Sequence, residues 1–346
     1  MPFTEDSRGK RARELRDRAR EAPTNVDPVE PLSLLESPQP SVRRDAIEAL
    51  REIAEAKPKS TTDAIPRLIA LLGTTDQQAE VHILEAAAAV ASVDPEAVAP
   101  SIMPIINRIE LRSSTHVLQA ATKVLAEVAT EYPEVTIDAV PRLAVALDHP
   151  DPRVKRNVLA ALSKIAETYP EEIRPLVDEL ERALEEDDER VIQAALATLG
   201  RLLSQYPMGS PHLLDMTLHL AEHDAVGVRA NAMGLLGDYL RHEEAEDTVI
   251  LGRLLDALED RTAMVRTNAM TAIGRIAVKT PDLVIEHADT IESCLDDVDP
   301  RVRERACFAL GAAQVHGARA ILSSIAKDDP DEDVRQRASW ALERVH

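Results

Sequence analysis

A valine recurs every 37 residues and marks a repeating hydrophobic pattern, at Val117, Val154, Val191, Val228, Val265 and Val302. Four residues after each valine stands a small or apolar residue, and eight residues after it stands a leucine or isoleucine. Positions four, seven, eight and eleven residues apart fall on one face of an α-helix, which turns by about 100° per residue. Each period is therefore predicted to contain an amphipathic, valine-led helix of about 15 residues.

Another helix is predicted between consecutive valine-led helices, as at residues 139–147, where a proline stands in the first turn. Proline is tolerated there because its missing N–H has no partner within the helix. The Asp- and Pro-containing segments between helices, such as residues 148–152, are typical of turns and helix N-caps. The repeating unit is therefore helix–turn–helix, and no segment favours a strand.

The pattern extends with small shifts to Val42 and Val81 at one end and to Val334 at the other. Self-similarity at such a period indicates an array of repeats. The spacing predicts about nine copies, near residues 28–56, 61–93, 95–131, 134–168, 171–205, 209–241, 245–279, 282–313 and 315–345.

Residues 296–311 and 328–342 resemble the second helix of a HEAT repeat, and the resemblance covers roughly residues 28–346. It implies an all-α, right-handed α-solenoid, or superhelix, of about nine helix–turn–helix HEAT-like repeats. In that family the first helices lie on the convex side and the second, valine-led helices line the concave side. The resemblance is specific for fold and weak for function, because such arrays carry many unrelated activities.

The resemblance also implies a ladder of ion pairs between repeats, joining an acidic turn residue to a basic residue after the valine. The acidic residues stand six positions before the valine, at Glu36, Asp148, Glu185, Glu222, Glu259, Asp296 and Asp328. The basic residues stand one position after it, at Arg43, Lys155, Arg229, Arg266, Arg303 and Arg335. The match fails at Leu111, Leu118 and Ile192, so a local change of curvature is expected in the second and third repeats.

Residues 1–27 precede the predicted array and mix arginines with acidic residues, for a net charge of only +1. A basic arm could touch nucleic acid or another anionic surface. The near balance of charges favours a solvated arm, flexible or partly helical.

The composition is acidic, with 61 Asp and Glu against 40 Lys and Arg and a net charge of −21. Excess acid with few lysine and aromatic residues is typical of a halophilic host, and an acidic adaptor protein of a mesophile is the alternative. No run of about 18 apolar residues is present and no apolar stretch follows Met1, so neither a membrane span nor a signal peptide is expected. Cys294 and Cys307 are predicted to be buried thiols, and the chain to be a cytoplasmic protein.

One short motif could carry chemistry: His219, Glu222 and His223 match H-x-x-E-H, the inverted zinc-protease signature. His212 and His242 are the candidate third ligands by proximity in sequence. However, Glu222 occupies the acidic turn position of the repeat, so the match is expected to be incidental. Neither a metal, a cofactor nor a catalytic residue is predicted, and a HEAT-like lyase or metal-dependent hydrolase is the less favoured interpretation.

Glycines recur nine positions after the valine, at Gly200, Gly237, Gly274 and Gly311. Their position after the helix leucine is unlike a phosphate-binding loop. A close approach of neighbouring helices explains them better.

Charge is segregated between the two kinds of helix. The five valine-led helices between residues 151 and 313 carry a net charge of +7 in a chain of −21. Several basic residues of these helices stand at positions, counted from the valine, that point away from the apolar face. They are the predicted partner-binding residues Arg153, Arg156, Lys164, Arg190, Arg201, Arg275, Arg301 and Arg305. Phe308 and Trp340 fall on the same side, although a merely solvated basic face fits the pattern equally well.

These observations predict a non-catalytic scaffold or adaptor that binds a protein partner, such as an acidic or extended segment, along its concave face. The alternative is a nucleic-acid- or chromosome-associated subunit with a basic inner groove. The overall negative charge disfavours general phosphate binding.

Overall fold

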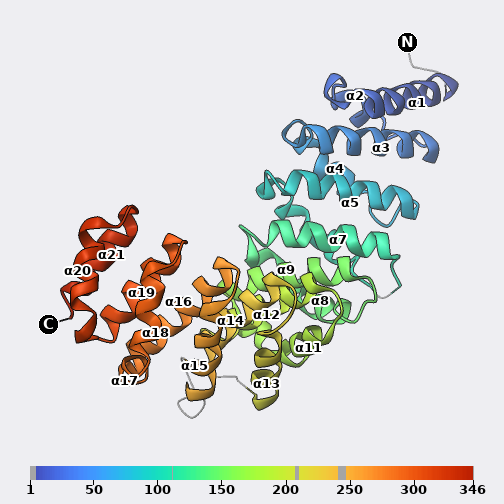
Figure 1. The fold of residues 1–346 in the computed structure, drawn as a ribbon. Helices are drawn as coiled ribbons and strands as arrows, with labels where there is room; N and C mark the ends of the chain where they lie inside the picture. Colours follow the sequence, from blue (N-terminus) through green and yellow to red (C-terminus); the bar gives the residue numbers. More distant parts are fainter. Residues whose placement is uncertain (1–4, 111, 207–209, 241–246, 346) are drawn as a thin grey trace. The chain divides into compact units, whose positions relative to one another are not determined.

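The computed structural model describes residues 5–110, 112–206, 210–240 and 247–345, and within these ranges all regular structure is helical (Figure 1). The chain divides into two compact units, Met1–Glu179 and Leu180–His346. The predicted all-α class and the solenoid architecture, in which helices stack on their sequence neighbours, are confirmed. The predicted repeat boundaries and the single array over residues 28–346 stay predictions.

In the first unit the long helices form one layer, in which each packs on the next (Figure 1). This long-helix layer contains α1 (Glu5–Glu21), α3 (Pro40–Ala56), α5 (Gln77–Ala91), α7 (Thr115–Val128) and α9 (Pro152–Thr168). Shorter helices cover its other side: α2 (Val29–Leu32), α4 (Ile65–Ile69), α6 (Ile102–Ile106), α8 (Val140–Ala146) and α10 (Pro170–Ile173). The 3₁₀ turns are η1 (Pro23–Asn25), η2 (Pro58–Ser60), η3 (Thr62–Ala64), η4 (Pro95–Ala97), η5 (Ala99–Ser101), η6 (Pro133–Ala139) and η7 (Arg174–Leu176). The boundary between the units falls within α11 (Val177–Arg182).

The second unit repeats the arrangement. Its long-helix layer contains α12 (Glu189–Leu203), α14 (Val226–Tyr239), α16 (Ala263–Lys279), α19 (Pro300–Ala312) and α21 (Glu332–Leu342), each in contact with the next. The other helices are α13 (Pro211–Leu220), α15 (Asp247–Asp256), α17 (Pro281–Ile285), α18 (Ala288–Ser293) and α20 (Arg319–Asp328). The 3₁₀ turns are η8 (Ala183–Glu185), η9 (Ala257–Glu259), η10 (Cys294–Asp296) and η11 (His316–Ala318).

Helix starts follow the predicted turn chemistry. The Asp151 carboxylate caps α9 by accepting the Arg153 N–H at 2.8 Å, and Asp299 caps α19 through the Arg301 N–H at 2.9 Å. The guanidinium of the same arginine also donates to each carboxylate, which lowers the pKa of both Asp151 and Asp299 to about 2. A capping side chain and a proline in the first turn together fix where these helices begin.

Residues 5–21 differ from the predicted solvated arm. They form α1, which packs against α3 and buries Ala12, Leu15 and Ala19. The Arg16 guanidinium donates to the Asp45 carboxylate of α3 at 2.6 Å. The sequence allowed a partly helical arm, but hydrophobic patterning misses its packing on α3 because its buried positions are few, mostly alanine, and embedded in charged residues.

The predicted ion-pair ladder is present at three arginines, but its acidic partner is wrong by one position. The predicted ladder residues Arg43 and Arg335 instead donate to backbone carbonyls of their own turns. Arg229, Arg266 and Arg303 pair with Asp260, Asp297 and Asp329, which stand five residues before the next valine rather than six. The residue at this position also accepts the N–H two residues on, so its carboxylate closes the turn while it faces the preceding long helix. Some acidic residues six positions before the valine bind arginines of the shorter helices, as in Glu36–Arg67 and Glu222–Arg253.

Where the ladder lacks its arginine, a histidine takes the place of the aspartate in the following turn. Leu118 and Ile192 replace the arginine, and the following turns carry His149 and His223 in place of aspartate. The Nδ1 atoms of these histidines accept the N–H groups of Asp151 and Ala225, both at 3.0 Å. An imidazole closes the turn without presenting a carboxylate to an apolar neighbour. Leu111 lies outside the described residues, and the predicted change of curvature stays a prediction.

The glycines nine positions after the valine lie where neighbouring long helices approach closely, as predicted. A Cβ at Gly237 would lie 2.7 Å from the Ala272 Cβ, and one at Gly311 would lie 2.6 Å from the Ala341 Cβ. A Cβ at Gly274 would lie 2.8 Å from the Phe308 ring. At Gly237 and Gly311 the added Cβ would also meet the Cα of the neighbouring alanine, so a larger residue there would push the helices apart.

Both cysteines are buried and unpaired, as predicted. Burial raises the pKa of Cys307 to about 12, which keeps it a thiol. None of the helices in the described parts of the chain has the length and apolar character needed to cross a membrane.

Candidate interaction surface

The H-x-x-E-H residues have structural roles at the end of α13 and in the turn that follows. His223 uses Nδ1 to accept the Ala225 N–H, and Glu222 forms an ion pair with Arg253. His242, a candidate third ligand, lies outside the described residues. Among the residues that are described, no group of three or more His, Cys, Asp or Glu side chains could hold a metal ion.

The eight predicted partner-binding residues lie on four long helices. Arg153, Arg156 and Lys164 are on α9, Arg190 and Arg201 on α12, Arg275 on α16, and Arg301 and Arg305 on α19. On α9 the cations engage their own helix: Arg153 pairs with its N-cap Asp151 at 2.7 Å, and Lys164 pairs with Glu167 at 3.4 Å. The Arg156 Nε donates to the Pro152 carbonyl at 3.3 Å.

Arg201 and Arg275 line the same groove, which crosses α12, α14 and α16 and has a volume of about 390 Å³. Its floor includes Gly200 and Gly234, and no atom lies within 4 Å of the place where a Gly234 Cβ would stand. The Arg275 Nη1 binds the Asp238 carboxylate of α14 at 2.6 Å. Because Asp238 is only 9% exposed, Arg275 also holds two long helices together. This ion pair could have been found in the sequence, since Asp238 stands one 37-residue period before Arg275.

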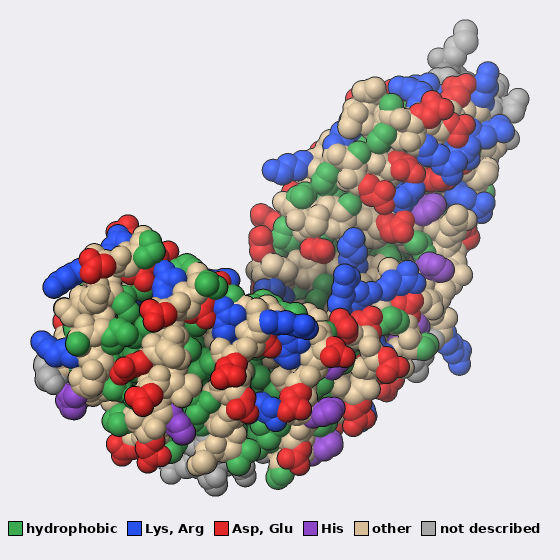
Figure 2. All heavy atoms as spheres, in the orientation of Figure 1, with side chains coloured by type: hydrophobic (Ala, Val, Ile, Leu, Met, Phe, Trp, Pro, Cys, Tyr) green, Lys and Arg blue, Asp and Glu red, His purple; other side chains and the backbone are tan. Residues whose placement is uncertain are grey.

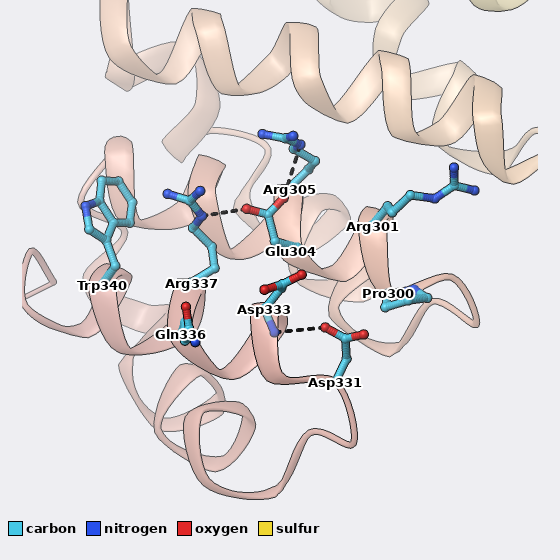
Figure 3. A pocket seen from close by; sticks show the side chains of 9 residues that line it. All are labelled: Pro300, Arg301, Glu304, Arg305, Asp331, Asp333, Gln336, Arg337 and Trp340. Carbon is cyan, nitrogen blue, oxygen red and sulfur yellow. Dashed lines mark hydrogen bonds and ion pairs between the residues drawn. The ribbon is translucent and has the colours of Figure 1, made fainter.

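Arg301 and Arg305 line a groove of about 520 Å³ between α19 and α21 (Figure 3). Glu304 lies at its centre, where it accepts from Arg337 at 2.6 Å and pairs with Arg305 at 3.1 Å. Figure 3 shows the side chains of Arg337, Arg305 and Arg301 following one another along the groove, with Trp340 at one end. Sequence reasoning placed the arginines and Trp340 on this side but missed the carboxylate that bridges two of them.

A stack of aromatic rings and guanidinium groups stiffens the Trp340 end of this groove. The Phe308 and Trp340 rings lie 5.2 Å apart with an interplanar angle of 16°. The Arg344 guanidinium lies 4.0 Å from the Trp340 ring centre, and that of Arg337 lies 5.4 Å from both rings. Such contacts fix the orientation of side chains that are only partly buried.

Comparison with protein families decides the identity of this architecture. Residues 22–206, more than half of the chain, match the model described as the adaptin N terminal region, and residues 251–343 match the model for HEAT repeats. The chain belongs to the HEAT-repeat family.

Solved structures similar to this HEAT-repeat chain agree on the fold. A crystal structure of an engineered protein has a TM-score of 0.80 at 20% identity, over 100% of this chain and 96% of that chain. Another engineered protein has a TM-score of 0.53 at 24% identity, over 62% of this chain and 98% of that chain. At these identities the likeness establishes the fold alone. No curated protein sequence matches the chain significantly.

The HEAT-repeat long-helix layer of the first unit also has a groove, and its chemistry differs. This groove, of about 200 Å³, crosses α3, α5 and α7 and is lined by Glu55, Glu85 and Lys123 among others. Burial raises the pKa of Glu85, although Arg51 lies within 3.7 Å of its carboxylate. On the face visible in Figure 2, acidic and basic side chains are intermixed over both units. Arginines therefore line grooves of the second unit's long-helix layer, each together with at least one carboxylate.

Proposed function

We propose that this HEAT-repeat chain is a non-catalytic scaffold that holds an acidic, extended segment of a protein partner against the long-helix layer of its second unit. One observation carries the proposal: Arg201, Arg275, Arg301 and Arg305 line two grooves of that layer. Guanidinium groups beside an aromatic ring are typical of protein–protein contact sites.

A protein segment fits these grooves better than a nucleic acid does. Asp238 lies in one groove, and Glu304, Asp331 and Asp333 line the other. Regularly spaced phosphates would meet these carboxylates, whereas a peptide can place a few acidic side chains opposite the arginines and N–H groups opposite the acids. A cytoplasmic location belongs to this proposal because unpaired, buried thiols are typical of proteins from a reducing compartment.

A photo-reactive residue in place of Ala197, which lines the α12–α16 groove, tests the proposal in cells. We expect it to cross-link to a protein, and we expect Arg201→Glu to reduce the cross-link. The matched control, Glu292→Lys on α18, reverses a charge away from the grooves and leaves the cross-link intact. Cross-linking to nucleic acid, or sensitivity only to the Glu292 change, would contradict the proposal.

The non-catalytic part of the proposal has its own test. Protein purified without a chelator is expected to contain less than one equivalent of zinc or iron, because His223 and Glu222 are engaged in a turn bond and an ion pair. A full equivalent of metal that is lost in His219→Ala would instead support the hydrolase interpretation.

A further inference from the structure

We propose that Asn231 and Asn268 bind the main chain of the extended partner segment in the groove that crosses α12, α14 and α16. This inference rests on the proposed function and assigns recognition of the partner's peptide groups to two side-chain amides. Asn231 on α14 and Asn268 on α16 each stand three residues after the repeat valine, and both line the groove.

One hydrogen bond to the preceding long helix orients each amide. The Asn231 Nδ2 donates to the Gln193 carbonyl of α12 at 2.9 Å, and the Asn268 Nδ2 donates to the Ala230 carbonyl of α14 at 2.8 Å. A carbonyl oxygen only accepts hydrogen bonds, so Nδ2 must face it and Oδ1 is turned away. Within the described residues neither Oδ1 accepts a hydrogen bond, and each Nδ2 has a second N–H. Each half-buried amide therefore keeps one acceptor and one donor for a ligand.

A peptide main chain has the groups that these two amides lack. In an extended chain the N–H and the C=O of one residue point to the same edge. A side-chain amide can accept from that N–H and donate to that C=O together. Neither hydrogen bond depends on the partner's side chains. Asn231 and Asn268 would thus hold the segment in place, whereas selection of its side chains is left to the arginines of the groove.

Small residues beside the asparagines let a main chain come close to the helices. Ala197 and Gly234 both line the groove, and no atom lies within 4 Å of the place where a Gly234 Cβ would stand. A Cβ at Gly237 would instead lie 2.7 Å from the Ala272 Cβ. Packing within the chain explains Gly237 but not Gly234, although a glycine inside a helix costs stability relative to alanine. Close approach of a partner's main chain accounts for Gly234.

The charges of the groove also suit a main chain. The Arg275 Nη1 binds the Asp238 carboxylate at 2.6 Å, and the Arg201 Nη1 donates to the Ala197 carbonyl at 3.1 Å. With a carboxylate among its lining residues, the groove is a poor site for closely spaced phosphates. Peptide groups carry no net charge and meet no repulsion there.

Titration of the full chain with synthetic peptides, followed by NMR, tests the inference. The protein is labelled with ¹⁵N at asparagine so that the side-chain amide signals of Asn231 and Asn268 report binding directly. The probe is a short blocked peptide of alternating glutamate and serine, and its fully N-methylated form has the same side chains without main-chain donors. We expect saturable shifts of both signals with the probe and about tenfold weaker binding of the N-methylated form, since at least two hydrogen bonds are lost.

Gly234→Leu separates binding from folding. It fills the groove and is expected to weaken peptide binding about tenfold. The melting temperature should not fall, because the Cβ enters open space and leucine favours a helix. Gly252→Leu on α15 is the matched control, since a Cβ there also meets no atom within 4 Å and the residue lies outside the groove. It should leave peptide affinity unchanged.

Asn268→Ala tests the amide itself and is expected to weaken peptide binding about fivefold. It also removes the bond to the Ala230 carbonyl, so its control must lose a bond of the same kind. Asn157→Ala on α9 meets this need, because the Asn157 Nδ2 donates to the Gln119 carbonyl at 3.0 Å and the residue lies outside the groove. We expect similar losses of stability for the two variants and a loss of affinity for Asn268→Ala alone.

Four outcomes would overturn the inference: no response to either peptide, equal affinity for both, unchanged binding in Gly234→Leu, or tighter binding of an oligothymidylate at the two amide signals. The cross-link from Ala197 distinguishes the two proposals. If it persists and depends on Arg201 while the peptides fail, the scaffold stands and main-chain recognition by the asparagines falls. If both fail, the proposed function falls as well.

Discussion

The first and second units stack long helices alike but join them with ion pairs of different burial. Arg44 and Asp76 join α3 to the start of α5 with side chains that are 50% and 43% exposed. Arg266 and Asp297 join α16 to the turn before α19 with side chains that are 12% and 10% exposed. The same type of contact is a surface pair in one unit and part of the packed interface in the other.

The two units also differ in the residues that stand nine positions after the valine. Gly200, Gly237, Gly274 and Gly311 let the long helices of the second unit approach closely, whereas the corresponding residues of the first unit include Arg51, Val90 and Ala126. The comparison indicates that the ladder pairs of the second unit are buried, whereas the Arg44–Asp76 pair of the first unit is exposed.

The largest effect is expected from breaking a buried pair. Arg266→Ala leaves the Asp297 carboxylate without its partner and removes the bond from Arg266 Nη1 to the Asp260 carbonyl, 2.8 Å long. Removing one member of a buried pair costs about 3 kcal/mol of unfolding free energy. Urea unfolding followed by Trp340 fluorescence reports this loss in the second unit. A loss below about 1 kcal/mol would show that the ladder is no stronger than a surface pair.

Overpacking a close approach is expected to have the next largest effect. Gly311→Ala places a Cβ 2.6 Å from the Ala341 Cβ and 2.7 Å from its Cα, which backbone atoms cannot relieve by rotation. The expected cost is about 2 kcal/mol. Gly252→Ala on α15 is the matched control because its Cβ meets no atom within 4 Å, and it is expected to stabilise slightly by favouring the helix. Equal melting temperatures for the two variants would contradict the close-approach explanation.

The sequence predicted many of the features that repeat, but it did not predict all of them. Helix type and periodicity follow from the valine-led pattern, and the glycine positions follow from their constant offset. The acidic ladder partner was placed one residue too early because acidic residues are frequent at both positions, so only geometry separates Asp297 from Asp296. The packing of α1 on α3 was missed because alanines such as Ala12 and Ala19 give little hydrophobic contrast.

The candidate site was predictable in part. Arg301, Arg305 and Trp340 share a side of their helices by offset alone, and they line the same groove. The bridging Glu304 was not anticipated because a carboxylate on a basic face looks like charge balance until its partners are located. Asn231 and Asn268, one period apart, show a missed signal: each donates to a carbonyl of the preceding long helix, at 2.9 and 2.8 Å.

Acid should weaken the second unit through its ladder. The Arg303 hydrogen bond lowers the pKa of Asp329 despite its burial. A carboxylate with a lowered folded-state pKa stabilises the fold above its unfolded value of about 3.9, and this contribution is lost as pH falls through the lower folded-state value. We expect Asp329→Asn to be less stable than the parent at pH 6, and the difference to shrink below about pH 4. Trp340-monitored urea unfolding across this range measures it, and a difference independent of pH would contradict the linkage.

The smallest effect is expected from the exposed pair of the first unit. Arg44→Ala removes the hydrogen bonds of Nε and Nη2 to Asp76, 2.9 and 2.7 Å long, but both side chains remain hydrated in the parent. Asp76 keeps its role as N-cap of α5 through the Ala79 N–H, so the helix start survives. Exposed pairs contribute about 0.5 kcal/mol, and salt screens them. Thermal unfolding followed by circular dichroism should therefore detect a shift at low salt that disappears at about 1 M salt. A loss of stability as large as that of Arg266→Ala, and insensitive to salt, would mean that ion pairs join the long helices equally strongly within each of the two units.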